Sequence, residues 1–183
     1  NIDVIPPDIN ISDSKFTIHE NRILYGLSAL KGVGEESMIE LVTNRKEKGA
    51  YKSLVDFNKR LSRSVLNKRQ IEKLILSNSF KSIHEDISKL FTNVENIIQK
   101  KEENSLFLDE DDSQFFLNKK IVKIDQIDAE FESYGFLYSQ KKQTSLLSKL
   151  NINSFKEKID SKSEIFEDFY FYVIKSQYKT TKN

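Results

Sequence analysis

The sequence predicts a mainly α-helical fold with an extended N-terminal segment and a truncated strand at the C-terminal end. Apolar residues recur with helical spacing over residues 23–98, and several short motifs have the form of helix caps. Pro6 and Pro7 disfavour a helix at the start of the chain. Aromatic and β-branched residues gather in residues 169–178, which is typical of a strand.

The elements follow in order from local signals. Residues 13–18 predict a turn that enters a short strand, and helical periodicity begins at Ile23. After a break at residues 32–34, the next helix should end near Gly49. Later helices begin at caps of the Ser/Asn-x-x-Asp/Gln type, and Asn78 ends one of them in a left-handed turn; the cap pairs are Ser53 with Asp56 and Asn67 with Gln70.

The remaining chain divides into a helix, a linker and a helical connector. Ser82 and Glu85 predict the start of one long helix that carries apolar residues through Ile98. Residues 100–124 lose the helical period and hold a run of acids, which predicts a linker. Another helix is expected over 125–139, followed by shorter helices.

Composition argues against several classes of function. The 183 residues contain no Cys and two His that lie far apart, which disfavours zinc sites, cysteine nucleophiles and a Ser-His-Asp triad. No apolar run is long enough for a membrane span. The absence of cysteine fits a reducing, cytoplasmic setting. The chain begins with Asn1 rather than Met and ends just after its strand, so we expect a fragment of a longer protein.

The net charge of +1 conceals unlike segments. Residues 1–81 carry +4, residues 82–133 carry −7 and residues 134–183 carry +4. Within the first segment, residues 45–81 hold 11 Lys and Arg against 3 acids, a local excess of +8. A polyanion would respond to this local excess, because salt screens exposed charges beyond about 8 Å.

A Gly-Val-Gly turn lies between two helical stretches, in Lys31-Gly32-Val33-Gly34. Two glycines allow a tight hairpin, let the backbone approach a phosphate and leave N-terminal amides of the next helix pointing at the anion. With its flanking apolar spacing the motif resembles a helix-hairpin-helix DNA-binding motif. The alternative is an interhelical turn that binds no ligand.

Nearby cations are candidate phosphate contacts: Lys52, Lys59, Arg60, Arg63, Lys68 and Arg69. About four such contacts would make duplex binding strongly salt-dependent, because each neutralised phosphate releases counterions. Backbone amides with Lys and Arg grip the DNA backbone and leave the base sequence unread.

Longer strings resemble the alpha subunit of bacterial replicative DNA polymerase III. They match in order and spacing: Pro6-Pro7-Asp8-Ile9-Asn10, Tyr25-Gly26-Leu27, Leu30-Lys31-Gly32-Val33-Gly34, Ser53-Leu54-Val55-Asp56-Phe57 and Asn67-Lys68-Arg69. A weaker similarity covers residues 132–139. The chain departs from the helix-hairpin-helix motif at Met38, and from the polymerase family at Asn78 and at Gln140-Lys141-Lys142.

The resemblance implies a domain order and a role. It implies the end of the fingers at 1–22, a helix-hairpin-helix duplex-binding domain at 23–99, an acidic linker at 100–124, a helical connector at 125–165 and the start of an OB domain at 166–183. The parent in this family is a DNA-directed DNA polymerase, a nucleotidyltransferase whose palm carboxylates hold two magnesium ions. Those carboxylates have no match here, so we expect no catalytic residue, metal ligand or cofactor in this segment.

The acidic segment contains a string that resembles the family's sliding-clamp-binding peptide, with Glu103 in place of the usual Gln. Its other candidate contacts are Ser105, Leu106 and Phe107. Two large apolar residues in an acidic linker suit a partner's pocket, although a linker that folds back on its own domain would also bury them. Expected partners are therefore duplex DNA, the sliding clamp and other polymerase III holoenzyme subunits.

Two other functions compete with the polymerase interpretation. One is a helical protein-protein interaction module whose Gly-Val-Gly turn is purely structural. The other is a base-excision enzyme built around the hairpin, which would need a catalytic acid or lysine beside it.

Overall fold

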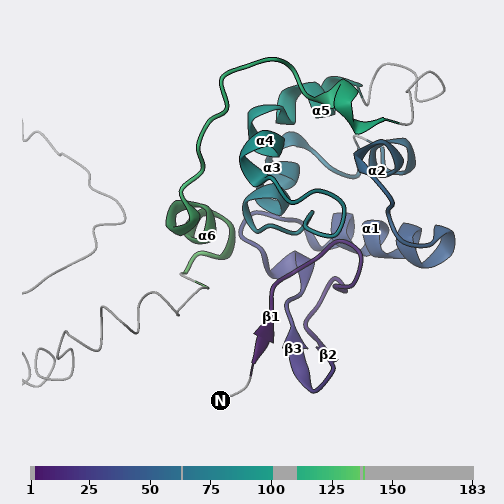
Figure 1. Cartoon of the computed structure of the whole chain (residues 1–183). Coiled ribbons are helices and arrows are strands. Elements are labelled where there is room, and N and C mark those ends of the chain that lie inside the picture. Colours follow the sequence, from purple (N-terminus) through teal and green to yellow (C-terminus); the bar gives the residue numbers. More distant parts are fainter. Residues whose placement is uncertain (1–2, 63, 101–110, 137, 139–183) are drawn as a thin grey trace, which may run out of the picture. The chain divides into compact units, whose positions relative to one another are not determined.

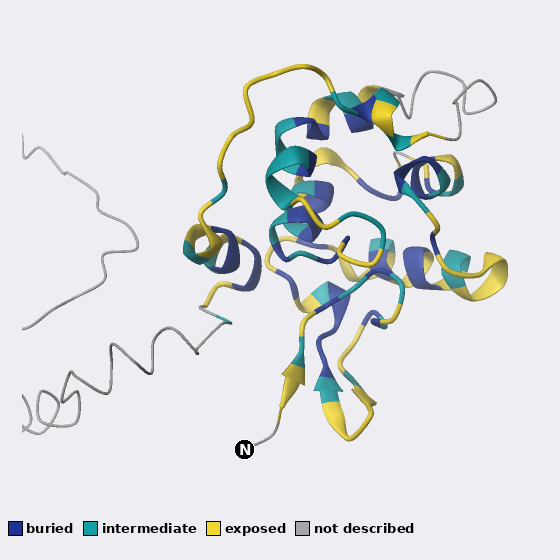
Figure 2. Ribbon diagram, in the orientation of Figure 1, coloured by how far each residue is buried: buried dark blue, intermediate teal, exposed yellow. Residues whose placement is uncertain are grey.

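The computed structural model describes residues 3–62, 64–100, 111–136 and 138. The chain divides into two units, residues 1–137 and 138–183, and every helix and strand described lies in the first. This unit is mainly helical, with a small sheet at one side (Figure 1), which confirms the predicted fold class. Its core is aliphatic and aromatic, and buried residues line the inner faces of the helices (Figure 2). The helical segments expected after residue 139, and the strand at 169–178, lie outside the described residues.

The N-terminal segment forms a three-stranded sheet in the order β1-β3-β2. The strands are β1 (Val4–Ile5), β2 (Thr17–His19) and β3 (Arg22–Leu24). β2 and β3 are joined by Glu20 and Asn21, whose φ angles of 49° and 58° suit a two-residue hairpin turn.

The prediction that a helix begins at Ile23 is wrong. Ile23 lies in β3, because the hairpin pairs it with Ile18 and β1 pairs it with Val4. The expected first helix is reduced to one 3-10 turn, η1 (Leu27–Ala29).

Helix bounds beyond η1 follow the local caps closely. The helices are α1 (Glu35–Lys48), α2 (Leu54–Arg60), α3 (Lys68–Leu76), α4 (Ile87–Thr92), α5 (Val94–Lys100), the 3-10 helix η3 (Asp112–Phe115) and α6 (Gln126–Tyr134). The Ser53 side chain caps α2, and the predicted capping box of Asn67 and Gln70 is formed at α3. Asn78 takes the predicted left-handed conformation, with φ 62°, just beyond α3.

The long helix predicted from Ser82 and Glu85 is replaced by two short helices. Asp86 is the N-cap of α4, where its carboxylate accepts the Lys89 N–H at 2.9 Å. The chain breaks at the buried Asn93, whose side-chain amide donates to the Lys89 carbonyl and whose oxygen accepts the Leu117 N–H. The Asn93 side chain, which also binds the backbone of Leu117, thus interrupts a helical pattern that is continuous in the sequence.

Residues 111–124, from the expected acidic linker, run along the helices. The Asp112 carboxylate accepts the N–H groups of Leu54 and Val55 at 3.1 and 3.0 Å, which adds a second cap to α2. Phe115 is fully buried, and Asn96 donates to its carbonyl at 2.8 Å. These contacts tie the segment to α2 and α5.

The last described helix, α6, is shorter than predicted. Asp125 caps its start by accepting N–H groups of the first turn. The helix ends at Tyr134 rather than near residue 139, because Gly135 adopts a left-handed conformation with φ 81°.

Candidate nucleic-acid interface

The hairpin at residues 31–34 connects η1 directly to α1. The Val33 N–H donates to the Leu30 carbonyl at 3.2 Å, and Gly32 has φ 79°, which an L side chain adopts only under strain. Gly34 is the N-cap of α1, and no described side chain caps this end. The turn therefore presents the start of a 14-residue helix with backbone N–H groups available to an anion.

The first turn of α3 packs directly on the two glycines. A Cβ at Gly32 would lie 3.3 Å from both Nε and Nη2 of Arg69, and a Cβ at Gly34 would lie 3.2 Å from Nε2 of Gln70. The Gln70 amide donates to Ser37 Oγ in the first turn of α1 at 3.0 Å. Both glycines thus lie close to side chains of α3, Gly32 also needs its left-handed backbone, and a guanidinium lies beside the hairpin.

Arg69 is the cation best placed to reach a phosphate at the hairpin. Its side chain is exposed, and within the described ranges it forms no hydrogen bond or ion pair. Sequence reasoning named Arg69 as one of several candidate contacts, but only the fold brings it against Gly32.

Lys31 is exposed at the first position of the hairpin and contacts α6. Its N–H donates to the Ser133 carbonyl at 2.7 Å, and its Nζ lies 5.6 Å from the centre of the Phe131 ring. The Lys31 side chain keeps its ammonium at the surface, while the hydrogen bond to Ser133 fixes the backbone of Lys31. The contribution of α6 to the hairpin was not predicted, since no local pattern links residues a hundred positions apart.

Lys68 lies next to Arg69 but already has acidic neighbours. Its Nζ lies 2.7 Å from Glu95 Oε1 and 3.8 Å from Glu72 Oε1. The Glu95 carboxylate raises the pKa of Lys68, and the Lys68 ammonium lowers the pKa of Glu95. Both side chains are exposed, so the pair is weak and screened by salt, and a phosphate could compete for the amine.

Two further members of the predicted basic group, Lys52 and Arg60, lie by the C-terminal end of α1 and not at its start. Lys52 is exposed beyond the C-terminal end of α1, which rises about 21 Å from Gly34. Its backbone N–H donates to the Asp56 carboxylate at 3.0 Å. Lys59 is exposed on α2, and Arg63 lies outside the described residues.

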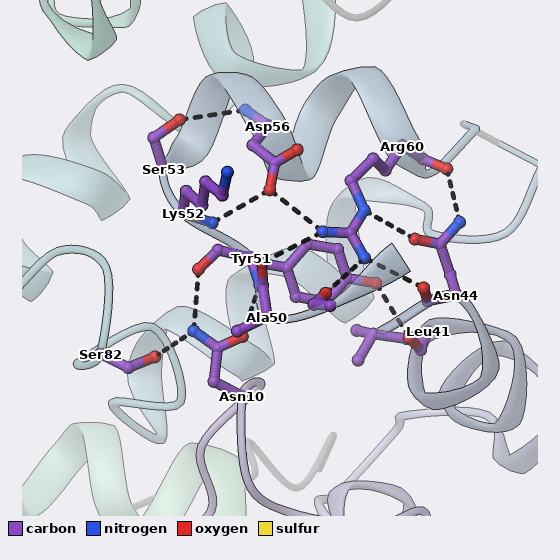
Figure 3. Close-up of polar contacts among 11 residues, drawn as sticks. Asn10, Leu41, Asn44, Ala50, Tyr51, Lys52, Ser53, Asp56, Arg60 and Ser82 are labelled. Carbon is purple, nitrogen blue, oxygen red and sulfur yellow. Dashed lines mark hydrogen bonds and ion pairs between the residues drawn. The ribbon is translucent and has the colours of Figure 1, made fainter. Parts of the chain in front are cut away.

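Arg60 has a structural role instead of the predicted phosphate contact. Figure 3 shows its guanidinium turned toward the C-terminal end of α1, where it donates to Asn44, Gly49 and Ala50. It also pairs with the Asp56 carboxylate at 3.1 Å, and the side chain is only 10% exposed. The guanidinium is therefore fully engaged in joining α2 to α1.

Arg45 is a second cation that the fold uses internally. Its Nη1 donates to the carbonyls of Ile9 and Ser12, each at 2.7 Å, which ties the N-terminal segment to α1. Burial lowers the pKa of Arg45, although its guanidinium stays charged. The local excess of +8 thus overstates the charge that faces outward at the hairpin.

Acids also lie near the hairpin. Glu35 and Glu36 occupy the first turn of α1, and the Lys15 ammonium pairs with Glu35 at 2.9 Å. Glutamates at this position stabilise the helix through its dipole. Both carboxylates would also repel a phosphate at the hairpin, where Lys31 and Arg69 supply positive charge.

The candidate clamp contacts Glu103, Ser105, Leu106 and Phe107 lie outside the described residues. In the described part of the chain no group of three or more His, Cys, Asp or Glu is arranged to hold a metal ion. None of the helices described is long and apolar enough to cross a membrane.

Comparison with known proteins places this hairpin in a family. Residues 1–90 match the model of the helix-hairpin-helix motif. The DNA polymerase III subunit alpha of Deinococcus radiodurans is 44% identical over 82 residues, which are 45% of this chain and 6% of that protein. The corresponding subunit of Aquifex aeolicus is 33% identical over 138 residues, or 75% of this chain and 12% of that protein.

A third relative extends the same similarity. The DNA polymerase III subunit alpha of Thermus aquaticus is 38% identical over 98 residues, which are 54% of this chain and 8% of that protein. The chain thus spans a small share, 6% to 12%, of the length of these relatives. It has a helix-hairpin-helix domain, and it belongs to the family of DNA polymerase III alpha subunits, of which it covers one segment.

Proposed function

We propose that this segment is noncatalytic and holds duplex primer-template DNA for a DNA-directed DNA polymerase. The observation that carries the proposal is the position of Arg69 against Gly32, beside the uncapped start of α1. A phosphate at this place would meet backbone N–H groups, the Arg69 guanidinium and the Lys31 ammonium together. Magnesium-dependent nucleotidyl transfer would belong to other parts of the parent subunit.

The geometry favours contact with the DNA backbone over readout of base sequence. Gly32 and Gly34 have no side chains, and Lys and Arg at the hairpin suit phosphate oxygens. Val33 is buried, so the hairpin presents no side chain between the two glycines. Duplexes of unrelated sequence should therefore bind with similar affinity.

A charge reversal at the hairpin tests this function. Arg69→Glu and Lys31→Glu should each weaken duplex binding about tenfold, because each removes a phosphate contact and adds repulsion. Fluorescence anisotropy with two duplexes of unrelated sequence measures the effect at low salt. Lys48→Glu is the matched control, because Lys48 is exposed in the last turn of α1, away from the hairpin, and its replacement should change affinity less than twofold.

Three outcomes would contradict the proposal. Equal losses for Lys48→Glu and Arg69→Glu would show that only total charge matters. Loss with one duplex and not the other would show base readout. Absence of duplex binding by the unaltered chain, together with a stable protein partner, would favour a protein-interaction module.

The clamp contact is a separate part of the proposal. Its support is the resemblance of Glu103 to Phe107 to the family's clamp-binding peptide. Double replacement of Leu106 and Phe107 by Ala should abolish co-elution with the sliding clamp and leave duplex affinity unchanged. Unchanged co-elution would dismiss this peptide as the clamp site.

A further inference from the structure

The end of α6 lies against the hairpin, although the two are far apart in the chain. The Lys31 N–H donates to the Ser133 carbonyl at 2.7 Å, and a Cβ at Gly135 would lie 3.9 Å from Lys31 Cδ. The Lys31 ammonium lies 5.6 Å from the centre of the Phe131 ring. The backbone, the aliphatic stem and the charged end of Lys31 therefore each meet the last turn of α6 or its C-cap.

The same helix is fixed to α3, which carries Arg69. The Tyr134 hydroxyl donates to the carbonyl of Ser77, the C-cap of α3, in a buried hydrogen bond of 2.9 Å. The Lys73 ammonium of α3 pairs with the Glu132 carboxylate at 2.8 Å. Thus α6 connects Lys31 to the helix that holds the second cation of the hairpin.

The composition of α6 does not suit a phosphate contact of its own. Residues 126–134 contain no Lys or Arg and three acids, Asp128, Glu130 and Glu132. Carboxylates repel a phosphate. An effect of α6 on duplex binding would therefore pass through the hairpin residues that it contacts, and Lys31 is the cation among them.

Restriction of the Lys31 side chain favours binding of an anion. A lysine that binds a phosphate loses rotamer freedom, and this loss weakens binding unless the side chain is ordered beforehand. The face of an aromatic ring attracts an ammonium that lies within about 6 Å of its centre. An ammonium has three N–H donors, so contact with the half-buried Phe131 ring leaves donors for a phosphate oxygen.

We infer that Phe131 is a positioning residue for duplex binding, whose ring holds the Lys31 ammonium beside the hairpin before DNA arrives. The inference deepens the proposed function and rests on it, since it requires that Lys31 contacts a phosphate. Phe131 acts through Lys31 and not on the DNA itself. The duplex-binding site then includes α6, which lies beyond residues 1–90, the part that matches the helix-hairpin-helix model.

A double-mutant cycle in duplex affinity, measured by fluorescence anisotropy at low salt, tests this role. Phe131→Leu keeps an apolar side chain but removes the ring face, so it should weaken duplex binding about threefold. Phe131→Tyr keeps the ring face and should bind as tightly as the unaltered chain. In the Lys31→Ala background Phe131→Leu should have no further effect, because the amine that the ring positions is gone.

Phe116→Leu is the matched control, because the Phe116 ring also lies beside an ammonium. Its centre is 4.2 Å from Lys89 Nζ, and the ring packs against His84. Its replacement should leave duplex affinity unchanged, because Lys89 lies on α4 and not at the hairpin. Thermal midpoints of all variants are measured beside the affinities. If Phe131→Leu is unfolded at the assay temperature, Phe131→Met takes its place, since methionine fills more of the space and also has no ring face.

Three results would overturn the inference. They are unchanged affinity of Phe131→Leu, the same loss from Phe131→Leu with and without Lys31, and equal losses for Phe131→Leu and Phe131→Tyr. If Lys31→Ala weakens binding and Phe131→Leu does not, the proposed function stands and only the positioning role fails. If Lys31→Ala binds as tightly as the unaltered chain, the phosphate contact of Lys31 fails, and the positioning role fails with it.

Discussion

Gly26→Ala is expected to destabilise the helical unit by about 3 kcal/mol or more. A Cβ at this position would lie 2.5 Å from the Lys15 carbonyl carbon, 2.7 Å from the Phe16 nitrogen and 2.8 Å from the Ser14 carbonyl oxygen. All three are backbone atoms. They are held in place because Leu27 and Ser28 donate their N–H groups to the carbonyls of Asp13 and Ser14.

A displacement of Gly26 would also move the hairpin, because Gly26 directly precedes η1 and the hairpin directly follows η1. Urea denaturation followed by circular dichroism measures the loss. Gly34→Ala is the matched control, because its Cβ would meet only side-chain atoms, the end of Gln70 at 3.2 Å and Ser37 Oγ at 3.7 Å, and it should cost less than about 1 kcal/mol. Equal stability of the Gly26→Ala variant and the parent chain would show that the segment before η1 does not lie where the structure has it.

Arg60→Met is expected to lower the free energy of unfolding by about 3 kcal/mol. Methionine keeps the apolar stem but removes the donor to several carbonyls at the end of α1, and it takes the cation from the Asp56 carboxylate, which keeps the Lys52 N–H. The Tyr51 ring, 4.2 Å from the guanidinium carbon, also loses its cation. The same denaturation experiment measures the change.

Two further variants make this result specific. Arg60→Lys retains the charge but cannot serve both helices with a planar fork, so it should lose about half as much stability. Lys59→Met, at the neighbouring exposed position, should change stability by less than about 0.5 kcal/mol. If Arg60→Met left the free energy of unfolding unchanged, Arg60 would again be a candidate phosphate contact.

Features encoded by a few adjacent residues were predictable from the sequence. The capping box of Asn67 and Gln70 forms because both partners lie within one turn, and Ser53 caps α2 for the same reason. Asn78 takes its left-handed turn because a short polar side chain tolerates that conformation. Local chemistry decides these positions whatever packs around them.

Features that depend on distant partners were not predictable. Ile23 fits a helical period, yet strand pairing with Val4 and Ile18 determines its conformation. Asn93 ends α4 because its side chain serves residue 117 as well as its own helix. Tertiary contacts overrode a weak local preference in both cases.

The candidate site shows the same division. The glycines of the hairpin could be identified because a tight turn and close backbone approach both require them. Charge counting could not separate Arg69, which lies at the hairpin, from Arg45 and Arg60, which bind carbonyls inside the unit. The role of a cation depends on what faces it, and a single sequence does not contain that information.

The most direct test of duplex binding through backbone contacts is its salt dependence. The logarithm of the association constant, measured by anisotropy between about 50 and 200 mM salt, should fall against the logarithm of salt concentration with a slope near −3 to −4, corresponding to about four phosphates. Arg69→Glu should make the slope shallower by about 1, because one contact is lost. A slope near zero, or one that Arg69→Glu leaves unchanged, would contradict a phosphate contact at this hairpin.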